Sequence, residues 1–438
     1  MNKIKNKLRK ITIVQILIFL ILAVYCPFST ADEISQPQEN MISETENNSD
    51  ITILSKHAIL MEQENGQILY EYNAHEKAYP ASTTKLMTAI LTLENCNLDD
   101  EVIVDSNALL GIPKSYTVAR LQPQEKITID QLMHVLLIPS ANDAANVLAF
   151  HIAGSIEDFA DMMNKKAKEI GCENTHFTNP SGIHDDNHYS TAYDMALIGN
   201  YASKFDTIME IAKNTTYSLS PLPTGVARTF KATNTLITPK NQYFYEYATG
   251  LKTGYTDKAK SCIVATAKKD DVNLLCVILG GDKTEDKKAQ RELDCKTLFE
   301  YGFNNYEYSN LCEENSLVDK SRINELPNNI ENVDITYSKT LHLMVPINNA
   351  YTTEYNLNSN INLPIKKGDM IGTVIYKFNG NSFKVDLLAA NDVYPIAMNG
   401  ENNLFIILLV ALILILLITL VKKKNRKRES RYFKRSLY

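Results

Sequence analysis

The most informative segment of this chain is Pro80-Ala81-Ser82-Thr83-Thr84-Lys85-Leu86-Met87-Thr88-Ala89. From Ser82 onward the apolar residues follow a helical spacing, which predicts a helix with one buried face. Ser82 and Lys85 are three residues apart, so a helix places the hydroxyl and the amine on the same face and within reach of each other. A lysine whose pKa is lowered by burial or by nearby cations can deprotonate a serine and make it a nucleophile. A helix N-terminus also offers a backbone N–H to an oxyanion.

Two other short motifs carry polar groups that fit the same chemistry. Ser140-Ala141-Asn142 precedes a predicted helix, where a turn or a helix cap is the simplest interpretation. Lys252-Thr253-Gly254 lies on a predicted strand, and its lysine and threonine offer a cation and a hydroxyl to a carboxylate. Alone, the first motif fits a capping serine beside a solvated lysine, and the third fits an edge-strand lysine. Together and in this order, the three are far more specific than any one of them.

The sequence around these motifs predicts an α+β fold. Strand-like runs at 57–62 and 67–71 flank Asn65-Gly66, a strong hairpin signal. Helices are expected from Ser82 and at 129–137, 141–153, 156–170 and 191–202, strands at 250–254, 261–268 and 273–279, and a helix at 285–301. Because strands occur at both ends of this region, we expect one antiparallel sheet with a helical insert over residues 51–305. Short alternating segments at 335–337, 340–345, 370–376 and 382–388 predict a small all-β domain over 306–396.

The two ends of the chain carry membrane-targeting signals. Five cations, an apolar run at 11–25, and Ser29 and Ala31 predict a signal peptide over residues 1–31, followed by a flexible polar leader at 32–50. A lipoprotein anchor at Cys26 is less favoured because Tyr25 stands where a small residue belongs. Residues 404–421 are apolar except for Thr419, which predicts one transmembrane helix rather than a buried core helix, since no polar face exists. The basic residues of 422–438 then predict a cytoplasmic tail and an extracytoplasmic catalytic domain.

Composition excludes several classes of function. The chain has 438 residues, 45% hydrophobic and 22% charged, which is typical of a globular protein. The net charge is −6, and the basic residues gather at the two ends, so the middle is strongly acidic and a nucleic-acid partner is not expected. The six cysteines beyond the signal peptide lack framework spacing, so no essential disulfide is expected. His184 and His188 have zinc-ligand spacing, but Pro180 and Gly182 favour a loop, and no metal or cofactor is expected.

The ordered motifs Ser-x-x-Lys, Ser-x-Asn and Lys-Thr-Gly resemble those of the low-molecular-mass penicillin-binding proteins, the serine D-alanyl-D-alanine carboxypeptidases. The resemblance covers residues 55 to 390 approximately, and it includes the segments 184–189 and 364–369. It implies a β-lactamase/transpeptidase-like catalytic domain, a β-rich second domain and a C-terminal membrane attachment. It also implies a peptidoglycan stem peptide ending in D-Ala-D-Ala as substrate, with β-lactam antibiotics as covalent inhibitors.

The resemblance assigns a role to each motif residue. Ser82 would be the nucleophile, Lys85 its base, and Ser140 a proton donor to the departing D-alanine. The substrate would be bound by five further residues, with the backbone N–H groups of Ser82 and Tyr255 as the oxyanion hole. These five residues are Asn142, Lys252, Thr253, Gly254 and Tyr255.

Two alternative functions use the same residues. A serine β-lactamase of class A would have Ser-Asp-Asn where this chain has Ser-Ala-Asn, and it would position its hydrolytic water with a glutamate. We find no glutamate in a comparable context between Ser140 and Lys252. A catalytically silent, wall-binding homologue is the second alternative, and the intact Ser82, Lys85 and Lys252 argue against it.

Overall fold

The computed structural model describes residues 51–219, 227–282, 289–323, 332–347, 350–358, 361–394 and 401–433 of the chain. The predicted signal peptide and leader, residues 1–50, lie outside the described residues, as do residues 434–438 of the predicted tail.

A five-stranded antiparallel sheet forms the centre of the first domain, with strand order β2-β1-β9-β8-β7. Its strands are β1 His57–Glu62, β2 Ile68–Tyr72, β7 Ala248–Thr256, β8 Lys260–Lys269 and β9 Val272–Gly281. β1 and β2 precede the helical region in the chain, and the other three strands follow it. The sheet is therefore built from both ends of the domain, as the sequence predicts, and β7 is left at one edge.

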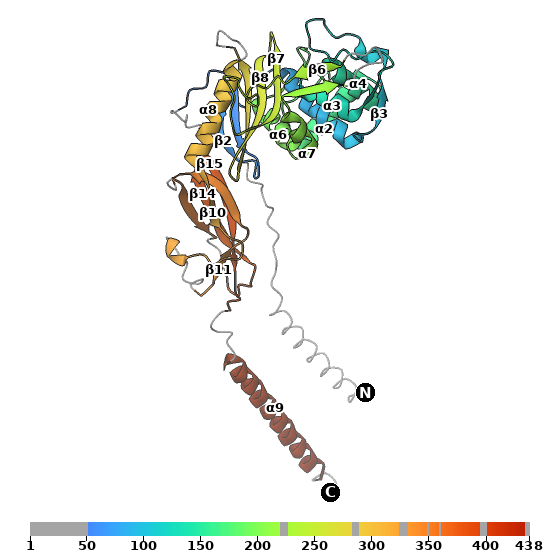
Figure 1. Ribbon diagram of the computed structural model, residues 1–438. Helices are drawn as coiled ribbons and strands as arrows, with labels where there is room; N and C mark the ends of the chain where they lie inside the picture. Colours follow the sequence, from blue (N-terminus) through green and yellow to red (C-terminus); the bar gives the residue numbers. More distant parts are fainter. Residues whose placement is uncertain are drawn as a thin grey trace. The chain divides into compact units, whose positions relative to one another are not determined.

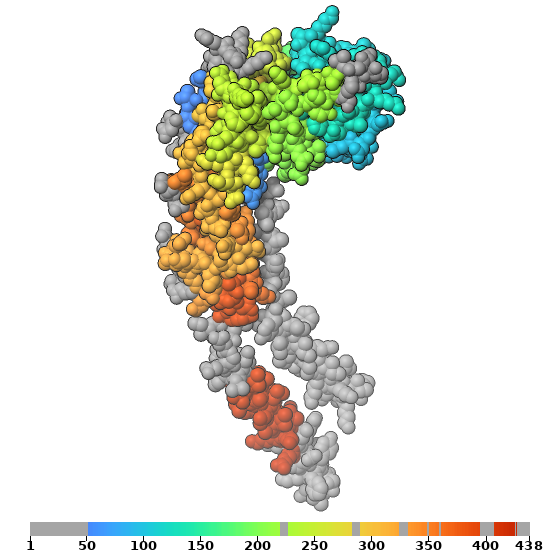
Figure 2. All heavy atoms as spheres, viewed as in Figure 1, coloured from blue at the N-terminus to red at the C-terminus, as the bar shows by residue number. Residues whose placement is uncertain are grey.

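Helices cover both faces of this sheet (Figure 1). The helices of the insert are α2 Lys85–Asn95, α3 Ile129–Leu137, α4 Asn142–Ala153, α5 Ile156–Ile170, α6 Ala192–Ala202 and α7 Asp206–Ala212. Alternate residues of β1 point to opposite faces, so Ile59 joins the core beneath the insert. Leu60 joins the core beneath α8 Ala289–Asn305, on the other face. Figure 2 shows the insert and the sheet strands packed as one continuous body.

Local sequence signals set the helix ends. Thr128 and Gln131 form a capping box at the start of α3, and Ser155 caps α5 through the Asp158 N–H. Gly171 ends α5 in a left-handed conformation that glycine adopts without steric cost.

The small sheets β3–β4 (Glu101–Ile103, Lys126–Thr128) and β5–β6 (Thr216–Leu219, Arg228–Lys231) were not predicted, because strands of three or four residues show too little alternation. Short 3-10 helices are η2 Ser106–Leu109 and η3 Lys320–Arg322.

In the described part of the second domain, the regular elements are strands, apart from η3. β10 Tyr306–Cys312 pairs with β12 Leu341–Pro346, and a four-stranded sheet has the order β11-β15-β14-β13. These four strands are β11 Ile335–Tyr337, β13 Thr352–Leu357, β14 Met370–Phe378 and β15 Asn381–Ala389. The side chain of Gln67, beside the β1–β2 turn, joins the two domains: it donates to the Met344 carbonyl at 2.7 Å and accepts from the Met344 N–H at 3.0 Å.

The final helix, α9, runs over Glu401–Phe433. Among the residues that the structure describes, no helix is both long and apolar enough to cross a membrane. The span predicted at residues 404–421 therefore stays a prediction.

Candidate active site

The Ser82 hydroxyl faces the Lys85 amine at the junction between a 3-10 turn and a helix. Ser82 lies in η1 Ala81–Thr84, and Lys85 is the first residue of α2, so the nucleophile is on a tight turn rather than on the regular helix we predicted. Side chains three residues apart eclipse each other in a 3-10 turn. The geometry accordingly brings Lys85 Nζ to 3.1 Å from Ser82 Oγ.

Lys85 is wholly buried, and its amine is surrounded by oxygen atoms. Besides Ser82 Oγ, Nζ contacts Asn142 Oδ1 at 2.8 Å and the Ser181 carbonyl at 2.6 Å. Burial first, and the Lys252 cation second, lower the pKa of Lys85 well below its usual value. A neutral amine has two N–H bonds and one lone pair. When Asn142 and Ser181 accept the two N–H bonds, the lone pair faces the Ser82 hydroxyl, which is the arrangement a general base requires.

Asn142 and the loop before α4 are held by buried polar contacts. The Asn142 side-chain amide donates to the Thr117 carbonyl at 2.9 Å, which fixes Oδ1 toward Lys85. The buried carboxylate of Asp143 accepts from the backbone N–H groups of Ala119 at 2.8 Å and Leu121 at 3.1 Å. The loop that carries Thr117 is thereby tied to the start of α4, and the amide cannot rotate away without breaking these contacts.

Ser140 does not cap the helix that follows it. The N-cap of α4 is Ala141, and Ser140 has a φ of +69°, a conformation uncommon outside glycine and asparagine. Its hydroxyl is buried and has no hydrogen-bond partner among the described groups. The helix-cap interpretation is therefore wrong. An unpaired buried hydroxyl on a strained residue is costly, and such groups concentrate at functional sites.

The loop 178–188 is a part of the site whose contacts the sequence did not reveal. It supplies the Ser181 carbonyl to Lys85, and Gly182 with φ +76° lies so close to η1 that an added Cβ would meet the Ala81 carbonyl oxygen at 1.9 Å. His188 pairs Nε2 with Thr84 Oγ1 at 2.8 Å and accepts the Thr178 N–H on Nδ1 at 3.1 Å. Burial lowers the pKa of His188 to about 3, so the ring is neutral. Nε2 therefore holds the loop against η1, and Nδ1 joins the two ends of the loop to each other.

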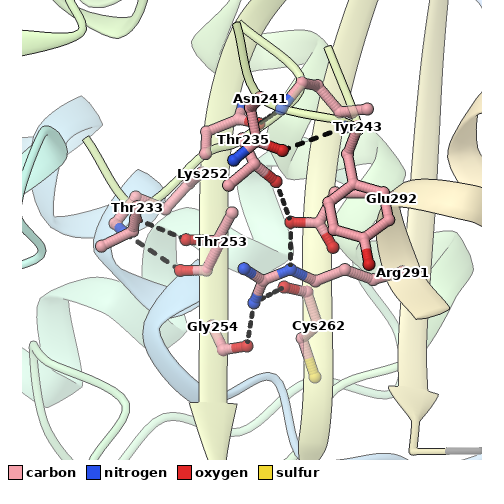
Figure 3. A network of polar contacts seen from close by, with 12 residues as sticks. Thr233, Thr235, Asn241, Tyr243, Lys252, Thr253, Gly254, Cys262, Arg291 and Glu292 are labelled. Atoms are coloured by element: carbon pink, nitrogen blue, oxygen red, sulfur yellow. Dashed lines mark hydrogen bonds and ion pairs between the residues drawn. The ribbon is translucent and has the colours of Figure 1, made fainter. Parts of the chain in front are cut away.

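The third motif lies on the edge strand β7. Lys252 Nζ donates to the Thr253 carbonyl at 3.0 Å and has no carboxylate partner in the described parts of the chain. Burial, with a smaller contribution from Arg291, lowers the pKa of Lys252 to about 7. The Thr253 hydroxyl lies 2.6 Å from that of Thr233, and Figure 3 shows both beside Lys252. An unpaired ammonium and a hydroxyl on one strand form a binding site for an anionic group.

Gly254 is the point at which β7 meets the nucleophile. An added Cβ there would lie 2.9 Å from Ser82 N and 3.0 Å from both Ala81 Cβ and the Pro80 carbonyl oxygen. Only glycine allows this approach. The contact places the backbone of the next residue, Tyr255, beside that of Ser82, where the oxyanion hole is expected. The structure thus brings all three predicted motifs together.

We expect Gly254→Ala to slow acylation of Ser82 by about 100-fold, because a displacement of about 1 Å at a reacting group has an effect of this size. The measurement is the labelling rate with fluorescent penicillin, the probe that the resemblance suggests. The matched control is Gly302→Ala, where the added methyl meets Leu274 Cδ1 at 2.7 Å in the core. Equal slowing in both variants would show that general packing strain, and not the position of Ser82, is responsible.

The low pKa of Lys252 also predicts a pH-dependent stability. The pKa of Lys252 is about 7 in the folded chain and 10.5 when the side chain is unperturbed. At pH values between these two, the unfolded chain holds a proton that the folded chain lacks, so the free energy of unfolding rises with pH. Below this range the buried charge opposes folding. We therefore expect Lys252→Met to raise the melting temperature at pH 6, with the difference from the original chain shrinking by pH 9. A difference that is constant with pH would contradict the burial of a titrating amine.

Comparison with known proteins gives a consistent result for both domains. The sequence profile of Peptidase S11, described as D-alanyl-D-alanine carboxypeptidase, matches residues 42–283. The profile of the penicillin-binding protein 5 C-terminal domain matches residues 306–403. The D-alanyl-D-alanine carboxypeptidase DacF of Bacillus subtilis is 32% identical over 77% of this chain and 85% of its own length. The D-alanyl-D-alanine carboxypeptidase DacC of Escherichia coli is 31% identical over 74% of this chain and 80% of its own length.

Solved structures agree with this result. The D-alanyl-D-alanine carboxypeptidase DacD of Francisella tularensis superposes with a TM-score of 0.67 at 25% identity, over 84% of this chain and 97% of that protein. The Streptomyces K15 DD-transpeptidase superposes with a TM-score of 0.53 at 30% identity, over 58% of this chain and 98% of that protein. The transpeptidase matches a smaller share of this chain than the carboxypeptidase does, 58% against 84%.

Proposed function

This chain belongs to the D-alanyl-D-alanine carboxypeptidase family, Peptidase S11, and we propose that its active site is the one built around Ser82 and Lys85. It is a serine-type D-alanyl-D-alanine carboxypeptidase, which removes the terminal D-alanine of peptidoglycan stem peptides through an acyl-enzyme and is inhibited covalently by penicillin. The observation that supports our assignment of the site is the buried amine of Lys85, 3.1 Å from Ser82 Oγ.

In the acylation step Ser82 Oγ attacks the carbonyl carbon between the two D-alanines. Its proton passes to the lone pair of Lys85, which Asn142 and Ser181 direct toward Ser82 by accepting the two N–H bonds. The negative charge that develops on the carbonyl oxygen is stabilised by the backbone N–H groups of Ser82 and Tyr255. The close contact between Gly254 and Ser82 supports this pair of donors.

The departing D-alanine needs a proton on its nitrogen. We assign this transfer to the Ser140 hydroxyl, backed by the Lys252 ammonium. The support is that the Ser140 hydroxyl is buried and has no partner among the described groups, so it is available to a ligand. When water attacks the acyl-enzyme, the ester bond to Ser82 breaks and Lys85 returns its proton to Ser82 Oγ. The proton lost by the attacking water restores the Ser140–Lys252 pair, and the shortened peptide leaves.

Lys252 and Thr253 bind the free carboxylate of the terminal D-alanine. Burial and the nearby Arg291 cation lower the pKa of the Lys252 ammonium to about 7, and a bound carboxylate would raise this pKa and favour the charged form. The hydroxyl of Thr253 adds a charge-assisted hydrogen bond. This pair explains how an acidic protein recognises an anionic substrate end.

The direct test of the activity is release of free D-alanine from diacetyl-Lys-D-Ala-D-Ala by the purified protein. We expect D-alanine release together with a long-lived penicillin adduct. A penicillin adduct that turns over rapidly, without D-alanine release, would support a β-lactamase instead. Absence of both reactions would support the silent homologue. The comparisons favour neither alternative, because the relatives and structures reported above are named as carboxypeptidases or a transpeptidase.

We further propose that the chain acts outside the cytoplasm, exported by residues 1–31 and attached to the membrane by residues 404–421, with 422–438 as a cytoplasmic tail. In this stretch of α9, the described large apolar side chains are all more than half exposed. An exposed apolar surface of this kind is stable only when a nonpolar environment such as lipid buries it. The basic residues that follow support the orientation. Fractionation tests this: a chain ending at Asn403 should leave the membrane fraction, and retention of that chain would refute the attachment.

A further inference from the structure

Thr233 connects two of the three motifs of the site. Its hydroxyl lies 2.6 Å from the hydroxyl of Thr253 on β7, and its backbone N–H donates to the Ile138 carbonyl at 3.2 Å, two residues before Ser140. It belongs to neither motif and lies in the segment between β6 and β7. Figure 3 shows Thr233 beside Thr253 and the Lys252 side chain. It therefore lies next to the groups that bind the substrate carboxylate, without being one of them.

The distance between the two hydroxyls restricts their hydrogen atoms. Each hydroxyl has one proton to donate, so in a pair at 2.6 Å only one of the two donates to the other. A carboxylate is an acceptor only, and Thr253 must donate its proton to it. Thr253 is free to do so when the proton between the two oxygens belongs to Thr233. A hydroxyl that accepts one hydrogen bond also donates a stronger one, because the bonds polarise each other.

The segment that carries Thr233 is fixed at its other end as well. Thr235 donates to Glu292 at 2.9 Å, and Glu292 accepts from Arg291 at 3.0 Å. Arg291 in turn donates to the Gly254 carbonyl at 3.0 Å. Figure 3 shows this chain of contacts leading back to β7, one residue beyond Thr253. The Thr233 hydroxyl is therefore held in a defined position relative to the strand.

We infer that Thr233 is a positioning residue that sets the selectivity of this enzyme for substrates with a free C-terminal carboxylate. It acts through Thr253, by donating to that hydroxyl and directing its proton to the carboxylate. The inference rests on the proposed function and adds a residue outside the three motifs to it.

The test compares two acylating agents that differ only at the carboxylate, benzylpenicillin and benzylpenicillin methyl ester. The quantity measured is the ratio of their second-order rate constants for acylation of Ser82. Thr233→Val removes the hydroxyl and keeps the shape, and it should lower the ratio about tenfold, as expected for weakening a hydrogen bond to a charged group. Thr233→Ser keeps the hydroxyl and should restore the ratio. The matched control is Thr229→Val, which removes a hydroxyl paired with Ser218 at 2.9 Å in the β5–β6 hairpin.

The outcomes separate the inference from the proposed function. A lower ratio in Thr233→Val, with the original ratio in Thr233→Ser and Thr229→Val, supports the inference. Equal slowing with both agents shows a merely structural role and overturns it, as does an unchanged ratio. If the original chain forms no adduct at Ser82 with either agent, the proposed function itself fails.

Discussion

Replacing Ser82 by alanine is expected to abolish covalent labelling by penicillin and to lower D-alanine release by about 10⁴-fold or more. Loss of the nucleophile of an acyl-transfer enzyme has effects of this order, and only binding and oxyanion stabilisation remain. Ser82 is partly exposed on the η1 turn, so the change removes one oxygen atom and leaves the core intact. The folded structure should be retained.

The measurement is intact mass after incubation with benzylpenicillin, combined with D-alanine release from the tripeptide. Ser218→Ala is a suitable control, since it removes an exposed hydroxyl that pairs with Thr229 at 2.9 Å between β5 and β6. A penicillin adduct in Ser82→Ala that matches the original chain would show that another residue is the nucleophile.

Lys85→Met and Lys85→Arg are both expected to slow acylation by about 10³-fold or more, since general bases contribute 10²–10⁴-fold. Methionine cannot accept a proton, and the guanidinium of arginine remains protonated at any working pH. Arginine carries a positive charge but cannot act as a base, so this variant distinguishes a role of Lys85 as the base from a role as a fixed cation. If the role of Lys85 were to provide a positive charge, arginine would preserve much of the rate.

The two variants are tested by stopped-flow acylation with fluorescent penicillin, with thermal unfolding as the control for folding. Removing a buried amine also removes three contacts, to Ser82, Asn142 and Ser181, so some loss of stability accompanies the substitution. Acylation by Lys85→Arg within tenfold of the original rate would exclude Lys85 as the base.

Regular elements with strong periodicity could be predicted from the sequence. The structure has helices at Ile129–Leu137 and Ile156–Ile170, with the bounds that the sequence predicts, because each combines a buried stripe with a polar cap. The hairpin around Asn65-Gly66 formed as its turn residues indicate. The helix α7 was missed, because seven residues are too few for the period to be distinguished from a turn.

The site was predicted less completely than the fold, because several of its groups are backbone atoms. The carbonyl that Ser181 presents to Lys85 has no side-chain signature, and its position depends on a loop that closes against η1. The positive φ of Ser140 is equally invisible in the sequence. Thr233 is one of many threonines, and only its distance from Thr253 distinguishes it. The three motifs indicated which residues carry chemistry, and the tertiary structure determines which of their atoms meet.

The most direct test of this account is a crystal structure of the protein after reaction with benzylpenicillin. We expect an ester on Ser82 Oγ, the penicilloyl carboxylate bound by Lys252 and Thr253, and Lys85 still in contact with Asn142. An adduct on a different residue, or a carboxylate bound away from β7, would contradict the claim that the three motifs form one active site.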